Sequence, residues 1–538
     1  MLPPSSESGI GEIASGWVLD RGRRRPTLLI MRGRLVRVSS VLLAGTVALT
    51  APAVPARASA PGDLRGDLDA ILADPRLDGA TVSAVVRDAG TGAVRYSRGA
   101  ATRMLPASNM KIYTSSAALS LLGTGYRFQT SVHAGPVSGS SVKGDLYLKG
   151  TGDPTMRAAE YDRLAAQVAA KGVKRVEGDL VADDTWFDAV RTPSHWDPAD
   201  LQYYYAAPIS ALTVAPNDDF DAGSINVSVT PTAQGRPVRV GLAPATGVVK
   251  IDNRAVTGRR GSASTVSVNR AAGSDTIVVR GSHPAGGAPL TVLRTVRKPT
   301  MYAADVFRRA LKAHGVQVKG ATERGRTPAD ANPIASRASM PLSGLMVPFL
   351  KLSNNMIAEI LVKAIGRKAK GQGSWDAGLP AIERYAGSLG VPSARLDMAD
   401  GSGLSRLDRT TAGDVGTVLR NVRTAPWYPA WYRALPVAGD PDRMAGGTLT
   451  SRMRGTPAAG NVHAKTGTLT GVTALSGYVT DPSGRPLVFS LILNGYPGGA
   501  PKDIEDRFAV RLAGGTSSAG PRSARSGQRL ECSWLKSC

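Results

Sequence analysis

The sequence predicts a mixed α/β (α+β) fold in which an antiparallel sheet is flanked by helices and interrupted by two inserted, β-rich domains. Two observations support this prediction. Helical and strand patterns follow one another in residues 61–126 and again in residues 319–513. Between them, residues 127–318 contain many short strand patterns and glycine-rich turns. At 538 residues, the chain is long enough for two or three domains.

The first part opens with a helical pattern at residues 64–73. Strand patterns at 81–88 and 93–97 follow, joined by Ala-Gly-Thr-Gly, which indicates a hairpin. A second helical run at 109–122 is closed by Gly123. These elements form the first half of the main domain.

The middle part is expected to hold helices at 158–171 and 301–314. Strands are expected at 225–229, 238–242, 265–268 and 276–279. We assign it to two inserted domains, the first formed by residues 127–238 and 293–318 and the second by residues 239–292.

The last part returns to the mixed pattern and completes the main domain as residues 319–513. Apolar residues recur at helical spacing in 356–365, and the glycine-rich Asp-Gly-Ser-Gly-Leu-Ser-Arg sequence at 400–406 predicts a loop. Three strands are expected at 462–469, 474–479 and 487–493.

Residues 1–60 resemble a leader that ends in a secretory signal. An apolar run at 41–49 and a small-residue cleavage motif at 58–60 follow three basic residues, Arg32, Arg34 and Arg37. The apolar run is too short to span a bilayer comfortably, so we expect a secreted, extracytoplasmic protein without a transmembrane anchor. Met31 directly precedes this pattern, which leaves Met1 and Met31 as alternative starts.

Charge and residue counts narrow the classes of function. The net charge of +24 suits a polyanionic neighbour, although a solvated basic surface explains it equally well. Aromatic residues make up only 5% and no nucleic-acid-binding motif is present, so we expect an anionic cell envelope rather than nucleic acid. The five histidines are scattered and both cysteines, Cys532 and Cys538, lie in residues 514–538, a Ser-, Gly- and Arg-rich tail expected to be disordered. We therefore expect neither a metal site nor another cofactor.

Ser108 and Lys111 form a Ser-x-x-Lys motif at the start of the second helical run. Their spacing places both side chains on one face, with the positive end of the helix dipole near Ser108. A serine hydroxyl becomes a good nucleophile when a neighbouring base takes its proton, and a lysine does this if its pKa falls. The motif alone also occurs by chance.

Ser353 and Asn355 belong to a Ser-Asn-Asn sequence that precedes a helical run. As ordinary residues they would cap that helix. As functional residues, Ser353 would relay a proton and Asn355 would bind a substrate amide.

The third motif, Lys465-Thr466-Gly467, lies on an expected strand. Lys465 and Thr466 are candidates to bind a carboxylate, and Gly467 leaves room for a substrate backbone. The N–H groups of Ser108 and Thr468 are candidates for an oxyanion hole. The alternative is a solvated lysine on an edge strand. His463 shares the face of Lys465, and we interpret it as structural.

In this order the three motifs resemble the signature of β-lactamases and penicillin-binding proteins. With Lys-Gly-Thr-Gly-Asp-Pro-Thr at 149–155 and Asp-Gly-Ser-Gly-Leu-Ser-Arg at 400–406, residues 62–513 are similar to the low-molecular-mass class C penicillin-binding proteins, a D-alanyl-D-alanine carboxypeptidase and endopeptidase family. The spacing of 245 positions from Ser108 to Ser353 fits this family, whose members carry two extra domains there.

The resemblance implies a serine peptidase that acts on the D-Ala-D-Ala end of peptidoglycan peptides and is acylated by β-lactams. Ser108 would attack the peptide, Lys111 would take its proton, Ser353 would pass a proton to the leaving amine, and Lys465 with Thr466 would bind the terminal carboxylate.

Two charged residues extend this comparison. In relatives, positions like Asp200 and Arg406 hold the amine and carboxylate of a diamino-acid side chain; otherwise they are a turn aspartate and a surface arginine. Two other functions remain open: a β-lactamase or esterase on the same fold, and a non-catalytic wall-binding protein that senses penicillin.

Overall fold

An antiparallel sheet of five strands organises the first and last parts of the chain. Its order is β18 (His463–Leu469), β19 (Val472–Thr480), β20 (Pro486–Asn494), β1 (Thr81–Asp88) and β2 (Val94–Arg98). The N-terminal hairpin joins the three C-terminal strands through the β1–β20 pair, in which Val85 lies opposite Ser490. The sheet matches the expectation from sequence. The computed structural model describes residues 63–516, so the leader and most of the expected tail lie outside the described residues.

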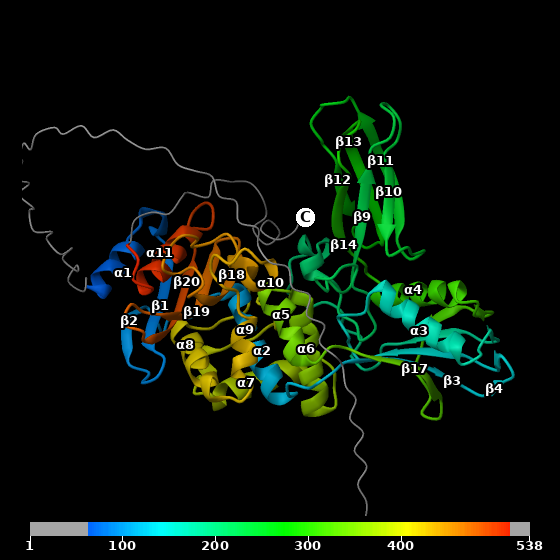
Figure 1. Ribbon diagram of the computed structural model, residues 1–538, viewed down its shortest axis with the longest axis horizontal. Coiled ribbons are helices and arrows are strands. Elements are labelled where there is room, and N and C mark those ends of the chain that lie inside the picture. The colour runs from blue at the N-terminus through cyan, green and yellow to red at the C-terminus, as the bar shows by residue number, and fades with distance from the viewer. Residues whose placement is uncertain (1–62, 517–538) are drawn as a thin grey trace, which may run out of the picture. The chain divides into compact units, whose positions relative to one another are not determined.

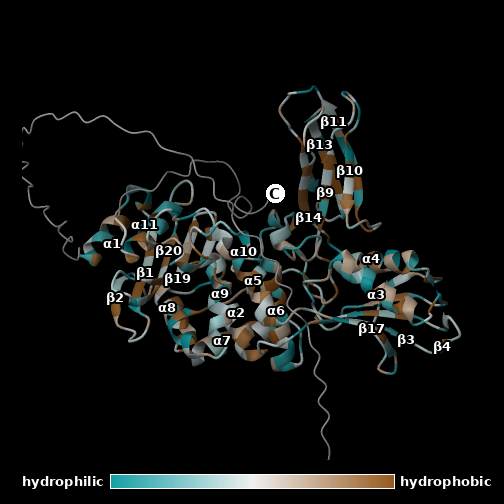
Figure 2. Ribbon diagram, in the orientation of Figure 1, coloured by the Kyte–Doolittle hydropathy of each residue, from teal (hydrophilic) through white to brown (hydrophobic). Residues whose placement is uncertain are grey.

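Helices cover both faces of this sheet (Figure 1). Successive residues of β1 point to opposite faces: Val86 packs in the cluster that holds α1 (Leu64–Leu72) and α11 (Lys502–Leu512), and Val85 packs with Ala412 of α8 (Ala412–Asn421). Because both faces are covered, the middle strands are long apolar runs, coloured brown in Figure 2. The helices behind α8 are α2 (Lys111–Leu121), α5 (Leu342–Lys351), α6 (Asn355–Lys370), α7 (Trp375–Ser388), α9 (Tyr428–Ala434) and the short α10 (Arg443–Gly446).

The first part of the insertion is a second five-stranded sheet, with two helices, α3 (Ala158–Ala170) and α4 (Pro299–Ala313). Its strands, in order, are β16 (Thr322–Arg324), β8 (Leu180–Asp183), β6 (Leu146–Gly150), β3 (Gln129–Ala134) and β17 (Asn332–Ala338). The same part of the chain also forms a small four-stranded sheet. Its order is β15 (Gln317–Val318), β7 (Arg175–Val176), β5 (Ser141–Val142) and β4 (Val137–Ser138).

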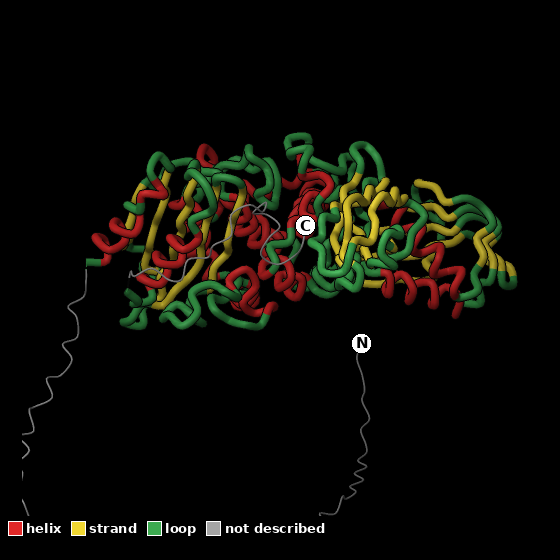
Figure 3. Tube along the Cα trace, turned by 90° about the horizontal axis from the view of Figure 1, so that it is seen from above, coloured by secondary structure: helices red, strands yellow, loops and turns green. Residues whose placement is uncertain are grey.

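Two three-stranded sheets make up the rest of the insertion. One is ordered β10 (Arg239–Ala243), β9 (Ser224–Thr230) and β14 (Leu290–Thr295), and the other β11 (Lys250–Gly258), β13 (Thr276–Pro284) and β12 (Ser267–Arg270). These strands are yellow in Figure 3. The sequence patterns missed β11 and β14. In β11, charged residues and turn-forming residues interrupt the apolar ones, so no strand pattern stands out.

Strand pairing crosses two of the expected domain boundaries. β9 lies before residue 238 yet pairs with β10 and β14, and β16 and β17 lie after residue 318 yet pair with β8 and β3. Each strand belongs to the sheet in which it pairs with another strand. Because that partner can lie far away in the sequence, the position of a strand along the chain does not reveal which sheet it joins. The division of the insertion into domains stays a prediction.

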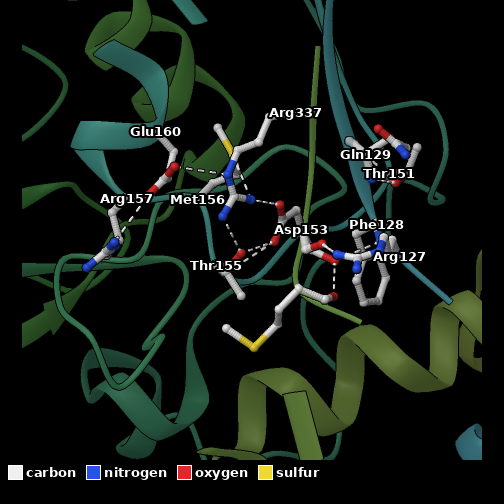
Figure 4. A network of polar contacts seen from close by, with 12 residues as sticks. Arg127, Phe128, Gln129, Thr151, Asp153, Thr155, Met156, Arg157, Glu160 and Arg337 are labelled. Carbon is white, nitrogen blue, oxygen red and sulfur yellow. Dashed lines mark hydrogen bonds and ion pairs between the residues drawn. The ribbon is translucent and has the colours of Figure 1, made fainter. Parts of the chain in front are cut away.

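A buried ion-pair network stabilises the insertion (Figure 4). Arg337 of β17 pairs with Asp153, and its Nε atom lies 3.0 Å from Oε2 of Glu160 in α3. Its guanidinium also donates to Thr155 Oγ1 at 3.0 Å. Asp153 and Thr155 belong to the Lys-Gly-Thr-Gly-Asp-Pro-Thr sequence. Burial raises the pKa of Asp153 and the charge of Arg337 opposes that rise, so the arginine helps to keep this carboxylate ionised.

We expect Arg337→Leu to destabilise the protein by about 3–5 kcal/mol, because it leaves the buried Asp153 carboxylate without its cation. Denaturant unfolding would measure the change. Arg163→Leu is the matched control: Arg163 also pairs with Glu160, but its side chain is 67% exposed, so a loss of about 0–1 kcal/mol is expected. Equal losses in the two variants would contradict the role of the buried network.

Candidate active site

Ser108 lies in a 3₁₀ turn, Ala107–Met110, that leads directly into α2. The sequence placed the helix start at Asn109, whereas α2 begins at Lys111. Ala107 has a φ of 47°, in the left-handed region, so the chain turns sharply just before Ser108. The tighter 3₁₀ geometry follows this turn and delays the regular helix.

Lys111 contacts Ser108 as the motif predicts. Its Nζ atom lies 2.8 Å from Ser108 Oγ, 2.7 Å from Asn355 Oδ1 and 2.7 Å from the Ser402 carbonyl oxygen. The lysine side chain is fully buried. Three oxygen atoms therefore surround the amine and direct it toward Ser108.

Burial lowers the pKa of Lys111 to about 7, and the nearby acids Asp400, Glu359 and Asp408 oppose this fall. An ordinary lysine would be almost wholly protonated at neutral pH. With a pKa near 7, a large fraction is neutral and able to take the Ser108 proton.

Ser353 and Lys465 form a second serine–lysine pair. Lys465 Nζ lies 2.8 Å from Ser353 Oγ and 2.7 Å from the Thr466 carbonyl oxygen. Burial, and next the charge of Lys111, hold the pKa of Lys465 well below its usual value. Ser353 has a φ of 55° between α5 and α6, and Asn354 rather than Ser353 caps α6. The strained backbone turns Ser353 out of the helix and toward Lys465.

β18 is an edge strand of the main sheet and runs beside the turn of Ser108. A Cβ atom on Gly467 would lie 2.7 Å from the Pro106 carbonyl oxygen and 3.2 Å from the Ser108 nitrogen. We expected this glycine to admit a substrate backbone, but the backbone that approaches it is the chain's own. Gly467 thus lets β18 lie close to Ser108.

A pocket at this point brings the predicted motifs together. Its lining includes Ser108, Ser353, Asn355, Thr466 and Thr468. Thr466 Oγ1 donates to Thr448 Oγ1 at 2.9 Å. Lys111 and Lys465 lie behind this lining, fully buried. His463 does not line the pocket; its ring stacks on Tyr432 with 4.3 Å between centroids.

The insertion supplies part of the pocket wall, which sequence reasoning missed. Tyr204, Tyr205 and Asp221 line the pocket, and Asn355 Nδ2 donates to the Tyr205 carbonyl oxygen at 2.9 Å. Asn355 therefore links Lys111 to the insertion in addition to any contact with substrate. In the sequence, this wall is marked by the Tyr203-Tyr204-Tyr205 run and by the nearby Asp200.

Asp200 and Arg406 do not line this pocket. Asp200 Oδ1 accepts a hydrogen bond of 2.9 Å from the hydroxyl of Tyr205, whose residue lines it. Arg406 is exposed and donates to the Thr470 carbonyl oxygen at 2.9 Å. Asp200 thus contacts the pocket wall through Tyr205. Arg406 is the last residue of the glycine-rich loop, and Leu404 of that loop lines the pocket.

The chain is similar to known proteins over most of its length. The model of the D-Ala-D-Ala carboxypeptidase 3 (S13) family matches residues 64–514. A D-alanyl-D-alanine carboxypeptidase of Actinomadura sp. (strain R39) is 49% identical over 502 residues, which cover 90% of this chain and 93% of that protein. The carboxypeptidase DacB of Haemophilus influenzae is 26% identical over 435 residues, covering 80% of this chain and 88% of that protein.

Among solved structures, penicillin binding protein 4 (dacB) of Haemophilus influenzae superposes with a TM-score of 0.73 at 23% identity, covering 83% of this chain and 98% of that chain. The predicted fold, an antiparallel sheet with helices plus inserted domains, is thereby confirmed, as is the resemblance to class C penicillin-binding proteins. With its motifs gathered in one pocket and its sequence matched over most of its length, the chain belongs to the D-Ala-D-Ala carboxypeptidase 3 (S13) family.

Proposed function

We propose that Ser108 is the nucleophile through which this serine-type D-Ala-D-Ala carboxypeptidase cleaves peptidoglycan peptides. Ser108 and Ser353 both lie 2.8 Å from a buried lysine. The observation that carries the assignment to Ser108 is its place beside β18, where its backbone nitrogen lies close to Gly467 and next to the strand that supplies Thr468. Lys111 takes the hydroxyl proton while Oγ attacks the carbonyl carbon, and the N–H groups of Ser108 and Thr468 stabilise the oxyanion.

Collapse of that intermediate breaks the C–N bond and leaves an ester on Ser108. The leaving amine needs a proton, and Ser353 Oγ, which lines the pocket and lies 2.8 Å from Lys465 Nζ, is the hydroxyl that passes one to it. Thr466 and Lys465 bind the terminal carboxylate. Water then hydrolyses the ester and frees Ser108.

A labelled penicillin tests this proposal. After brief incubation, mass mapping is expected to find the adduct on the peptide that contains Ser108, with slow release. Rapid turnover of the antibiotic would favour the β-lactamase alternative. No covalent adduct would favour a non-catalytic wall-binding protein, and an adduct on Ser353 would reverse the assignment of the two serines.

Asp200 and Arg406 carry the opposite charges that a zwitterionic diamino-acid end requires. The bond from Tyr205 to Asp200 supports a position near the pocket. We expect Asp200→Ala and Arg406→Ala each to lower kcat/KM for a peptide with that free end roughly ten- to hundredfold. Acylation by simple penicillins is the control and is expected to stay near normal. An unchanged preference between peptides with and without the zwitterionic end would show that both are surface charges.

We place the protein outside the cytoplasm, near an anionic cell envelope. The leader pattern and the charge of +24 support this. In residues 63–516, the part that the structure describes, no helix is long and apolar enough to cross a membrane. N-terminal sequencing of exported protein would locate the cleavage site.

A further inference from the structure

Three buried acids lie behind the catalytic base: Glu359 of α6, Asp400 of the glycine-rich loop, and Asp408 just after that loop. All three are fully buried. The reaction described above uses none of them directly. Their environments differ, and this difference assigns them different roles.

Asp400 folds the glycine-rich loop around its own carboxylate. Oδ1 accepts hydrogen bonds from the backbone N–H groups of Ser402 at 3.0 Å and Gly403 at 2.6 Å. Oδ2 accepts from the N–H of Ser405 at 2.7 Å. Several N–H donors on two oxygens are the surroundings of an ionised carboxylate.

This loop presents a catalytic contact. The carbonyl group of Ser402 lies between the two N–H groups, of Ser402 and Gly403, that Asp400 Oδ1 binds. Its oxygen accepts a hydrogen bond of 2.7 Å from Lys111 Nζ. Gly403 packs so closely on the Ala107 carbonyl that a Cβ would lie 1.8 Å from that oxygen. The loop therefore fits against both the base and the turn that carries Ser108.

The insertion also contacts Asp400. The indole N–H of Trp196 donates to Asp400 Oδ2 at 2.9 Å, and His195 Nδ1 lies 2.9 Å from Ser405 Oγ. Trp196 is buried at 3% exposure. Two neighbouring side chains of the insertion thus hold the loop that touches the base.

Both of the other acids have raised pKa values, although Glu359 also accepts N–H hydrogen bonds from Trp375 and Gly401. Burial, and next the charge of Asp400, hold the pKa of Asp408 well above its usual range and raise that of Glu359 to about 7. Oδ1 of Asp408 accepts from the N–H groups of Ala399 at 2.8 Å and Asp400 at 3.2 Å. An asparagine would keep both of these bonds at position 408.

We propose that Asp400 is a positioning residue for Lys111. Its carboxylate holds the Ser402 carbonyl oxygen against the Lys111 amine and supplies a negative charge near that amine. Through Trp196, which binds Asp400, the insertion takes part in catalysis. This inference rests on the proposed role of Lys111 as base. The titratable groups that face Lys111 are Glu359 on α6, Asp400 in the glycine-rich loop, Asp408 just after that loop, and Lys465 on β18.

The test compares Asp400→Asn with Asp408→Asn, two identical chemical changes in one cluster. The measurement is the second-order rate of acylation by penicillin from pH 5 to 9. Asp400→Asn removes a negative charge behind Lys111, so the protonated amine is less stable and the acidic limb is expected to move toward lower pH. The plateau of the acylation rate of Asp400→Asn is expected to fall at least tenfold, because the NH₂ group of the asparagine faces N–H donors of the loop and cannot accept their hydrogen bonds. Asp408→Asn replaces a neutral acid by a neutral amide and is expected to leave the limb in place.

Trp196→Phe provides a second variant should Asp400→Asn fail to fold. It removes one donor from Asp400 and keeps the charge, so the plateau is expected to fall severalfold with the limb unmoved. A limb that Asp400→Asn leaves in place, or a Trp196→Phe variant with wild-type rates, would overturn the inference. A wild-type profile without an acidic limb would instead count against Lys111 as the base and thus against the proposed function.

Discussion

Ser108→Ala is expected to abolish both peptide hydrolysis and covalent labelling by penicillin. Without the hydroxyl no acyl-enzyme forms, and removal of the nucleophile in another serine peptidase lowers kcat on the order of 10⁶-fold. The remaining donors of the oxyanion hole leave only a small residual rate. Steady-state hydrolysis of a D-Ala-D-Ala peptide and intact-mass analysis after penicillin treatment measure the two effects.

The fold of this variant is expected to be unchanged. Ser108 is half-buried, and its Oγ contact with Lys111 is the one hydrogen bond of this hydroxyl seen in the described residues. Thermal unfolding close to that of the wild type serves as the control. Penicillin labelling that persists in a folded Ser108→Ala protein would move the nucleophile to another serine.

The second large effect concerns Lys111 and pH. Because burial lowers its pKa to about 7, the amine is neutral above that pH and protonated below it. Only the neutral form takes a proton, so acylation is expected to rise tenfold per pH unit up to about pH 7 and then to level off. At pH 5 the rate is then about a hundredfold below the plateau.

Lys111→Ala removes the base and is expected to slow acylation by about 10²–10⁴-fold at pH 8, where the wild type is fully active. The remaining acylation rate of this variant is expected to show no rise with pH up to about pH 7, because the group that titrates there is gone. Stopped-flow acylation by a chromogenic β-lactam at each pH gives both values. If the variant keeps the same limb, another group in the pocket is the base.

The sequence indicated the candidate residues of the site and most of the strands of the sheet. Ser108 with Lys111, Ser353 and Lys465 sit in short motifs whose spacing is local, and the strands at 81–88 and 462–493 show strong apolar patterns, so their types and approximate limits could be predicted. The antiparallel sheet flanked by helices followed from the family resemblance, which the comparisons confirm, whereas the order of its strands comes from the structure.

Tertiary structure alone decided which distant groups complete the site. Asp400, Trp196 and Tyr205 reach the base or its pocket from other parts of the chain, and no periodicity connects them with Ser108. The same holds for β9 and β17, whose partners set the sheets they join. The low pKa of Lys111 also appears only on folding, because it arises when the chain removes water from the amine and places acids behind it. Local patterns fix residue types and elements; burial and long-range contacts fix protonation and position.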